Sequence, residues 1–245
     1  MGSFLSTLWT WINDASMIIA QQRCIVCGRR LHTRQEQICL SCFNQLPFTN
    51  IHGEKGNKME RLFWGQIPIV RANAYIYYHP HAEDTSIFMD LKYRNRPQIG
   101  IIFGRLMAGD LMDTDFFKDI DVVVPIPLAK ERLRQRGYNQ SEMLAKGVCE
   151  ITHLPLDTQS VLRTVSNPTQ TRLNAQERKA NVSHIFTLSP HHQLAHKHIL
   201  LIDDILTTGA TLISCAQEIA KAEEVCISVL TLGLAGSHFS IERGL

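Results

Sequence analysis

Short, almost continuously apolar runs alternate along the chain with longer stretches in which apolar residues recur at the spacing of a helix. The runs that indicate buried strands cover 67–79, 121–127, 160–163, 198–202 and 225–233. The stretches with helical spacing cover 82–93, 99–112, 140–152 and 210–224. Strands that are buried on both faces carry apolar residues at nearly every position, so this alternation predicts an α/β fold with a parallel sheet flanked by helices.

The same pattern divides the chain into four segments. The sequence predicts a helix over 1–22, a small cysteine-rich module over 23–48, a mixed, glycine-containing linker over 49–66 and the α/β domain over 67–240. The first segment has an apolar stripe that includes Leu5, Leu8 and Ile12, with polar residues opposite. We expect this helix to pack on the rest of the protein.

Membrane insertion of the first segment is the weaker interpretation. No run of about 18 uninterrupted apolar residues is present, so the sequence predicts no transmembrane segment. The segment also lacks the basic start of a secretory signal, and Asn13 and Asp14 interrupt its apolar positions. An interfacial helix anchored by Trp9 and Trp11 is an alternative, although the usual basic flank is missing.

Four of the seven cysteines form two C-x-x-C pairs. Cys24 and Cys27 are separated from Cys39 and Cys42 by eleven residues, and Gly28 provides the tight turn that lets backbone amides approach the sulfurs. Zn²⁺ prefers four soft ligands in a tetrahedron, and an all-cysteine set leaves no open position for a reacting water. The spacing therefore predicts a structural zinc module, with two disulfides or a redox pair as the alternative. Thiolate ligands also indicate a reducing compartment, most simply the cytoplasm.

The positive charge is concentrated in two short segments. Apolar residues make up 44% of the chain and the net charge is +2, which by itself indicates no nucleic-acid or membrane partner. Residues 127–139 and 163–181, however, each carry four basic residues against one acidic residue. This clustering predicts an anionic ligand.

The strongest candidate site follows the apolar run 198–202. Asp203 and Asp204 come at its end, where ligands bind in parallel sheets, and a turn of small and hydroxyl-bearing residues leads into the next helix. The turn consists of Thr207, Thr208, Gly209, Ala210 and Thr211. Backbone amides at a helix start bind phosphate, whereas carboxylates accept hydrogen bonds from sugar hydroxyls. Together they predict a site for a ribose 5-phosphate unit.

The stretch LLIDDILTTGATL resembles the phosphoribosyl-pyrophosphate (PRPP) motif of type I phosphoribosyltransferases. With VVVPIPLAKERLRQRGYNQSEMLA, TQTRLNAQERKAN and the cysteine pairs, it is similar to the ComF family of competence and DNA-uptake proteins, also labelled GntX-like. The resemblance extends from about Cys24 to Gly233 and implies a phosphoribosyltransferase-like domain that binds PRPP with Mg²⁺. It also implies catalytic roles for Asp203 and Asp204.

The resemblance assigns the first basic segment to the pyrophosphate of the ligand and most of the second to a hood loop that closes over the substrate. The first follows the strand 121–127 in the position of the pyrophosphate loop and contributes Lys130, Arg132, Arg134 and Arg136. The second, over 164–181, corresponds to the hood loop and contributes Arg172 and Arg178. Guanidinium groups suit pyrophosphate because they donate in bidentate geometry. A solvated helical face is the alternative for the first segment, and Asn139 would cap the helix that follows it.

Three functions agree with these features. The first is a PRPP-dependent transferase acting on an unidentified acceptor. The second is a non-catalytic accessory protein of the competence machinery, in which the zinc module and basic segments hold single-stranded DNA. The third is a regulator that senses PRPP or a related nucleotide. Fold does not distinguish them, because function depends on the site.

Overall fold

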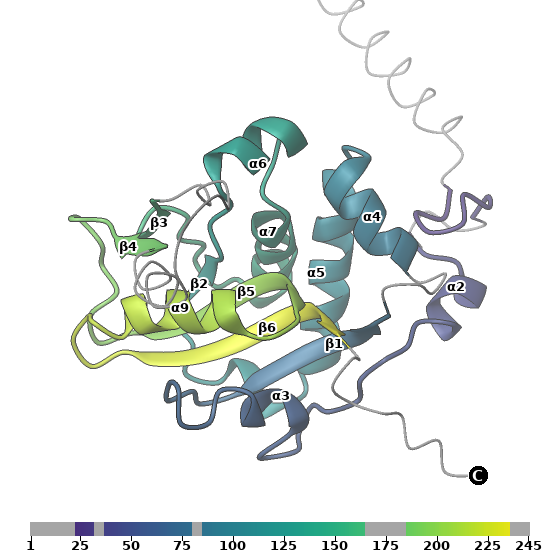
Figure 1. Cartoon of the computed structure of the whole chain (residues 1–245). Coiled ribbons are helices and arrows are strands. Elements are labelled where there is room, and N and C mark those ends of the chain that lie inside the picture. Colours follow the sequence, from purple (N-terminus) through teal and green to yellow (C-terminus); the bar gives the residue numbers. More distant parts are fainter. Residues whose placement is uncertain (1–22, 32–36, 80–84, 165–184, 236–245) are drawn as a thin grey trace, which may run out of the picture. The chain divides into compact units, whose positions relative to one another are not determined.

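The computed structural model describes residues 23–31, 37–79, 85–164 and 185–235 (Figure 1). The chain forms two compact units, Met1–Leu46 and Pro47–Leu245. The predicted helix over 1–22 lies outside the described residues, and so does most of the predicted hood loop. No helix within the described ranges is long and apolar enough to span a bilayer.

The smaller unit is built around the cysteine pairs. A short β-bridge joins Arg23 to Arg30 across the turn of the first pair, and α2 (Leu40–Asn44) starts directly after Cys39. This arrangement brings the two pairs together within a short segment of chain.

The larger unit contains a four-stranded sheet in the order β1–β6–β5–β2, and all neighbouring strands are parallel. The strands are β1 (Ala72–Tyr78), β2 (Val122–Pro125), β5 (His198–Leu206) and β6 (Cys226–Ala235). In the centre of the sheet, Leu201 of β5 lies beside Val124 of β2 and Val229 of β6. All three side chains are buried, and the predicted α/β class with a parallel sheet is confirmed.

Helices cover both faces of this sheet, as Figure 1 shows. The helices of this unit are α3 (Lys58–Arg61), α4 (Thr85–Tyr93), α5 (Pro97–Leu111), α6 (Lys130–Arg136), α7 (Gln140–Thr152) and α9 (Ala210–Ile219), with a 3₁₀ turn at Asp115–Phe117. Buried residues of α9 pack on one face of β5 and β6, while α5 and α7 lie on the other. These three helices thus cover parts of the sheet that would otherwise expose apolar side chains.

The α5–α7 contact is close because both helices carry glycine where they meet. A methyl group added at Gly104 would collide with the carbonyl oxygen of Leu144, and one added at Gly147 would collide with that of Ile101. Only a residue without a side chain allows the two backbones to approach this far. The two glycines therefore allow an unusually close packing of α5 against α7.

Residues 49–66 differ from the predicted linker. They contain α3, and Met59 and Phe63 are fully buried in the core below the sheet. Asn57 caps α3 by accepting hydrogen bonds from the backbone N–H groups of Met59 and Glu60. Two buried apolar residues four positions apart, with Leu62 packed beside them, attach this short helix, although most of the segment around them is polar.

The predicted strand at 160–163 forms a separate small sheet. It corresponds to β3 (Val161–Arg163), which pairs antiparallel with β4 (Phe186–Leu188) and not with the main sheet. Val161 of β3 and Phe186 of β4 are the buried residues of this small sheet. This small sheet places Arg163 beside the carboxyl ends of the main strands.

Candidate functional site

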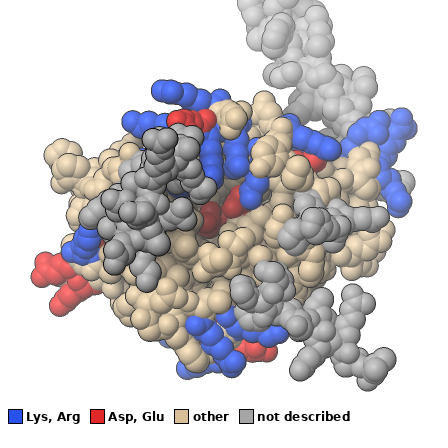
Figure 2. Space-filling model, in the orientation of Figure 1, with Lys and Arg blue, Asp and Glu red and all other residues tan. Residues whose placement is uncertain are grey.

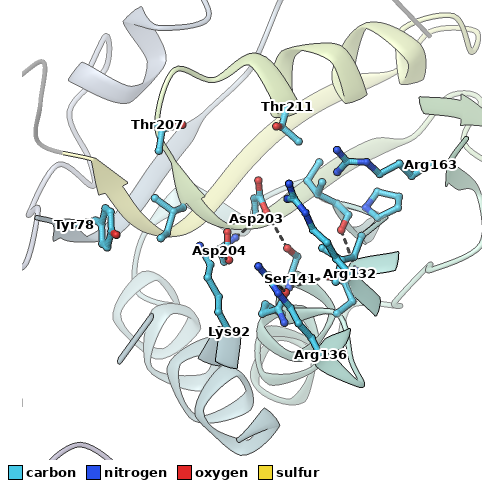
Figure 3. A pocket seen from close by; sticks show the side chains of 16 residues that line it. Tyr78, Lys92, Arg132, Arg136, Ser141, Arg163, Asp203, Asp204, Thr207 and Thr211 are labelled. Atoms are coloured by element: carbon cyan, nitrogen blue, oxygen red, sulfur yellow. Dashed lines mark hydrogen bonds and ion pairs between the residues drawn. The ribbon is translucent and has the colours of Figure 1, made fainter. Parts of the chain in front are cut away.

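A cavity of about 320 Å³ lies at the carboxyl ends of β2 and β5 (Figure 3). The predicted residues that line it are Arg132, Arg136, Asp203, Asp204, Thr207 and Thr211. Side chains that the sequence did not single out complete it, chiefly Tyr78, Lys92, Gln140, Ser141 and Arg163. Residues from five separate parts of the chain thus surround one acid pair.

Asp203 is held by two hydrogen bonds to the same oxygen. The hydroxyl of Ser141, in the first turn of α7, donates to Asp203 Oδ1 at 2.9 Å, and the backbone N–H of Asp204 donates to it at 2.9 Å. Burial raises the pKa of the Asp203 carboxyl, and the charge of Asp204 raises it further, whereas these hydrogen bonds and Lys92 oppose the rise. Asp203 is therefore a poorly solvated carboxyl group in a fixed orientation.

Asp204 forms an ion pair with a residue from another helix. Lys92 Nζ, in the last turn of α4, lies 3.1 Å from Asp204 Oδ2, and both side chains are largely buried. The end of α4 is itself held in place, because the Tyr138 hydroxyl donates to the carbonyl oxygen of Leu91 at 2.6 Å. The two adjacent carboxylates thus have different partners, a hydroxyl for one and an ammonium group for the other.

The threonine-rich turn has the backbone geometry of an anion site. Gly209 has a left-handed φ of 78° and precedes α9, whose first turn leaves N–H groups without partners inside the helix. Thr207 and Thr211 face the main cavity, as Figure 3 shows, while Thr208 and Ala210 line a smaller hollow at the turn itself. N–H groups, hydroxyls and the positive end of the α9 dipole converge there, which suits a phosphate.

The basic residues predicted for a pyrophosphate loop instead form α6, and the helix divides them. Arg132 and Arg136 are four positions apart, share a face and extend into the cavity. Arg136 also donates to Gln140 Oε1 at 2.8 Å. Lys130 and Arg134 occupy another face of α6 and line an adjoining hollow. The helix explains why only half of the predicted cluster surrounds the acid pair.

Sequence reasoning missed several polar residues of the cavity, among them Ser141, Lys92 and Arg163. Lys92 lies in a helix without a recognisable motif, Ser141 lies in the family-like stretch 122–145 but was not singled out, and Arg163 was counted only as part of a basic segment. The predicted cap is confirmed, because Asn139 Oδ1 accepts from the backbone N–H of Ser141 at 3.2 Å. That cap fixes the start of α7 and so the place of Ser141. Arg172 and Arg178 lie outside the described residues.

The four cysteines of the smaller unit form one cluster. The sulfur atoms of Cys24, Cys27, Cys39 and Cys42 all lie within 4.8 Å of one another, and none is in a disulfide. Cys27 Sγ and Cys39 Sγ are 3.7 Å apart, and the backbone N–H of Cys39 points at Cys24 Sγ at 3.4 Å. Gly28, with φ of 73°, forms the predicted tight turn. Four convergent thiols are the ligand set of a structural metal such as zinc.

Several curated proteins resemble the chain over most of its length. It is 28% identical to the DNA utilization protein YhgH of Escherichia coli K12 over 212 residues, 85% of this chain and 88% of that protein. It is 27% identical to competence protein F of Haemophilus influenzae over 207 residues, 78% of this chain and 87% of that protein. It is also 37% identical to competence protein ComFC of Bacillus subtilis over 107 residues, which is 42% of this chain and 41% of that protein. The predicted resemblance to competence proteins is confirmed.

Solved structures give partial matches. Glutamine PRPP amidotransferase of Bacillus subtilis, complexed with ADP and GMP, matches with a TM-score of 0.40 and 16% identity over 58% of this chain and 30% of that chain. A hypoxanthine phosphoribosyltransferase of Staphylococcus aureus matches with a TM-score of 0.34 and 18% identity. The match covers 56% of this chain and 63% of that chain. No family model matches the chain.

Proposed function

Because the chain is homologous to bacterial proteins named for DNA utilization and competence, we propose that it is a PRPP-binding protein of DNA uptake with a phosphoribosyltransferase-like site. One observation carries the proposal: Asp203, Asp204 and the two ends of the threonine-rich turn, Thr207 and Thr211, line the same cavity as Arg132 and Arg136. Sugar hydroxyls and phosphoryl groups are the chemical groups that these two sets of side chains recognise.

We propose one orientation for PRPP in the cavity. Its 5-phosphate would accept hydrogen bonds from the turn, its 2′ and 3′ hydroxyls would donate to Asp203 and Asp204, and its pyrophosphate would lie near the arginines of α6. Ser141 keeps Asp203 Oδ1 oriented for this contact, and Lys92 keeps Asp204 from repelling the ligand.

A phosphoribosyl transfer needs no nucleophilic side chain. The C1–O bond to pyrophosphate breaks, pyrophosphate leaves with the electron pair, and a lone pair of the acceptor forms the new bond to C1. Arg132 and Arg136 would stabilise the charge that grows on the leaving group. Asp203 and Asp204 would orient the ribose and stabilise its positive charge in the transition state. Mg²⁺ bound to PRPP would neutralise pyrophosphate charge, and the carboxylates nearby are the hard oxygen donors it prefers.

The cysteine cluster would hold structural Zn²⁺. Its four sulfurs would supply all the ligands that structural zinc needs and leave no position for a substrate, so we assign the cluster to stability and not to catalysis. Thiolates that bind metal persist where thiols stay reduced, which agrees with a cytoplasmic location.

Calorimetry with PRPP and Mg²⁺ tests the proposal, with Asp203→Asn, Asp204→Asn as the double variant. We expect binding by the wild type and a loss on the order of 100-fold in the variant, since two hydrogen bonds to charged groups are removed. Absence of PRPP binding by the folded wild type would refute the proposal. A panel of nucleobase and amine acceptors, assayed for pyrophosphate release, then separates an enzyme from a PRPP sensor that binds without turnover.

Single-stranded DNA handling is a second candidate function, supported by a neighbouring hollow of about 470 Å³. Its described lining includes Lys92, Tyr93, Arg134 and Arg136 and no carboxylate, and the Tyr93 side chain is 65% exposed. Figure 2 shows basic side chains gathered on one part of the face that it draws, next to acidic side chains. A cationic groove beside an exposed aromatic ring suits the phosphates and stacked bases of a single strand.

Binding of oligo-dT at increasing salt tests this second function. We expect affinity to fall steeply with salt in the wild type, Tyr93→Ala to weaken binding about 10-fold, and Arg134→Ala to reduce the salt dependence. Asp113→Asn, on the exposed surface outside the hollow, is a control that should bind as the wild type does. Affinity that does not change with salt or with Tyr93 would exclude this role.

A further inference from the structure

The main cavity and the hollow of about 470 Å³ beside it share two cationic side chains. Lys92 comes from the last turn of α4 and Arg136 from the last turn of α6, and each lines both spaces. Figure 3 shows both side chains beside the acid pair. A ligand in either space therefore meets the same two charges.

Each shared side chain contacts groups that belong to only one of the two spaces. Lys92 Nζ lies 3.1 Å from Asp204 Oδ2 in the cavity. Arg136 donates to Gln140 Oε1 at 2.8 Å, and Gln140 lines the cavity but not the hollow. The Arg136 guanidinium also lies 5.3 Å from the centroid of the Tyr93 ring, which lines the hollow but not the cavity. A ligand that draws Lys92 or Arg136 into the hollow would therefore remove positive charge from the cavity.

The helix ends that carry the shared residues are joined to each other. The hydroxyl of Tyr138, two residues after the end of α6, donates to the carbonyl oxygen of Leu91 at 2.6 Å. Leu91 directly precedes Lys92 in α4. We therefore expect the two backbones to stay in place when a ligand enters, and the long side chains of Lys92 and Arg136 to reorient.

The charges of the two spaces make simultaneous occupation by two anions unfavourable. The hollow is lined by Lys92, Arg134 and Arg136, so two of its three cationic side chains also line the cavity. A polyanion in one space uses charge that a polyanion in the other also needs. The two polyanions would in addition repel each other, because charges are screened only beyond about 10 Å at ordinary salt.

We infer that PRPP and single-stranded DNA compete for this protein, because the cavity and the hollow depend on the same two side chains, Lys92 and Arg136. PRPP in the cavity would release a strand from the hollow, and a strand in the hollow would weaken PRPP binding by the same factor. This inference rests on the proposed PRPP site and on the hollow as the site of the strand. It adds a regulation that neither site implies alone: the protein holds DNA where PRPP is scarce.

The test measures the affinity for fluorescent oligo-dT by anisotropy, with Mg²⁺ alone and with saturating PRPP and Mg²⁺. We expect PRPP to weaken oligo-dT binding on the order of 10-fold, and saturating oligo-dT to weaken PRPP binding equally in calorimetry. The arm with Mg²⁺ alone corrects for screening of the strand by the cation. PRPP should not change oligo-dT binding by the double variant Asp203→Asn, Asp204→Asn, because that variant lacks the PRPP contacts.

Two arginines of α6 provide a matched pair of variants. Arg134 lines the hollow but not the main cavity, whereas Arg136 lines both. Arg134→Met should weaken oligo-dT binding and leave the effect of PRPP at about 10-fold. Arg136→Met should weaken both ligands and reduce the effect of PRPP to about threefold or less, since only Lys92 then remains shared.

Four results would overturn the inference, and each has a different meaning. If the protein binds both ligands but oligo-dT affinity is unchanged or higher with PRPP, the two sites stand and competition is refuted. An unchanged effect of PRPP in folded Arg136→Met would show that the shared side chains are not its cause. Binding of PRPP without any binding of oligo-dT would refute the hollow as a DNA site. Absence of PRPP binding would refute the proposed PRPP site itself.

Discussion

Ser141 and Asp203 are 62 residues apart in the chain, yet the Ser141 hydroxyl donates a 2.9 Å hydrogen bond to Asp203 Oδ1. The bond connects the first turn of α7 to the carboxyl end of β5, so a helix determines the orientation of the acid that the strand presents. It also favours the charged form of a carboxyl group whose surroundings favour the neutral form.

Replacing Ser141 with Ala should therefore weaken PRPP binding in a pH-dependent way. Loss of the hydrogen bond raises the pKa of Asp203 further, so the carboxylate that accepts the ribose hydroxyl forms only at higher pH. We expect a loss of about 10-fold at neutral pH that recovers as pH rises. Calorimetry between about pH 5 and pH 9 measures this, with exposed Ser86→Ala as control. A pH-independent loss would contradict the stated cause.

Asp203→Asn should stabilise the folded chain while it removes the ligand contact. The pKa of Asp203 is raised by folding, so the unfolded chain loses this proton at lower pH and native stability falls as pH rises through the raised pKa. Asparagine carries no charge, and its amide oxygen can still accept from Ser141. We expect a gain of about 1–2 kcal/mol at pH 8 and none at pH 4, measured by urea unfolding. Exposed Asp113→Asn should show no such difference between the two pH values.

Removal of a cluster cysteine should release metal without abolishing ligand binding. Cys39→Ser leaves three thiols, and we expect the purified protein to lose about one zinc per chain by elemental analysis. PRPP affinity should stay within about threefold, because every residue of the cavity belongs to Pro47–Leu245. Cys226→Ser, at an exposed position outside the cluster, should keep its metal. Zinc retained by Cys39→Ser would contradict a four-cysteine site.

Gly147→Ala should destabilise the larger unit by about 3 kcal/mol or more. Its methyl group would overlap the carbonyl oxygen of Ile101, which belongs to backbone and has little room to move. Gly109→Ala provides the matched control in α5, since no atom lies within 4 Å of the added carbon there. Because alanine favours helix more than glycine does, this control should be neutral or up to about 1 kcal/mol more stable. Thermal unfolding measures both.

Local patterns in the sequence predicted the strands and the acid–threonine turn, because apolar runs and glycine positions depend on neighbours along the chain. They did not predict Lys92 or Ser141 as part of the cavity, since both belong to it only through packing between helices. The basic stretch was assigned to a loop. Its seven residues form a helix, and the helical turn decides that Arg132 faces the acids while Lys130 does not.

The segment 49–66 is a second stretch in which the structure has a helix where the sequence predicted a linker. Its polar composition hides two apolar anchors, Met59 and Phe63, that attach α3 to the core. Average composition underestimates how much structure such a segment has, because a few buried side chains are enough to order it. The Asn57 cap was the signal available in the sequence.

The glycines between α5 and α7 have a mechanical consequence for the sugar-binding acids. Because the backbones of α5 and α7 are in contact at these glycines, we expect a shift of α5 to displace Ser141 in the first turn of α7. α5 has no residue in the cavity, yet through α7 and Ser141 it would influence the orientation of the Asp203 carboxylate. Substitutions in α5 are therefore expected to change the orientation of Asp203, although they lie outside the cavity.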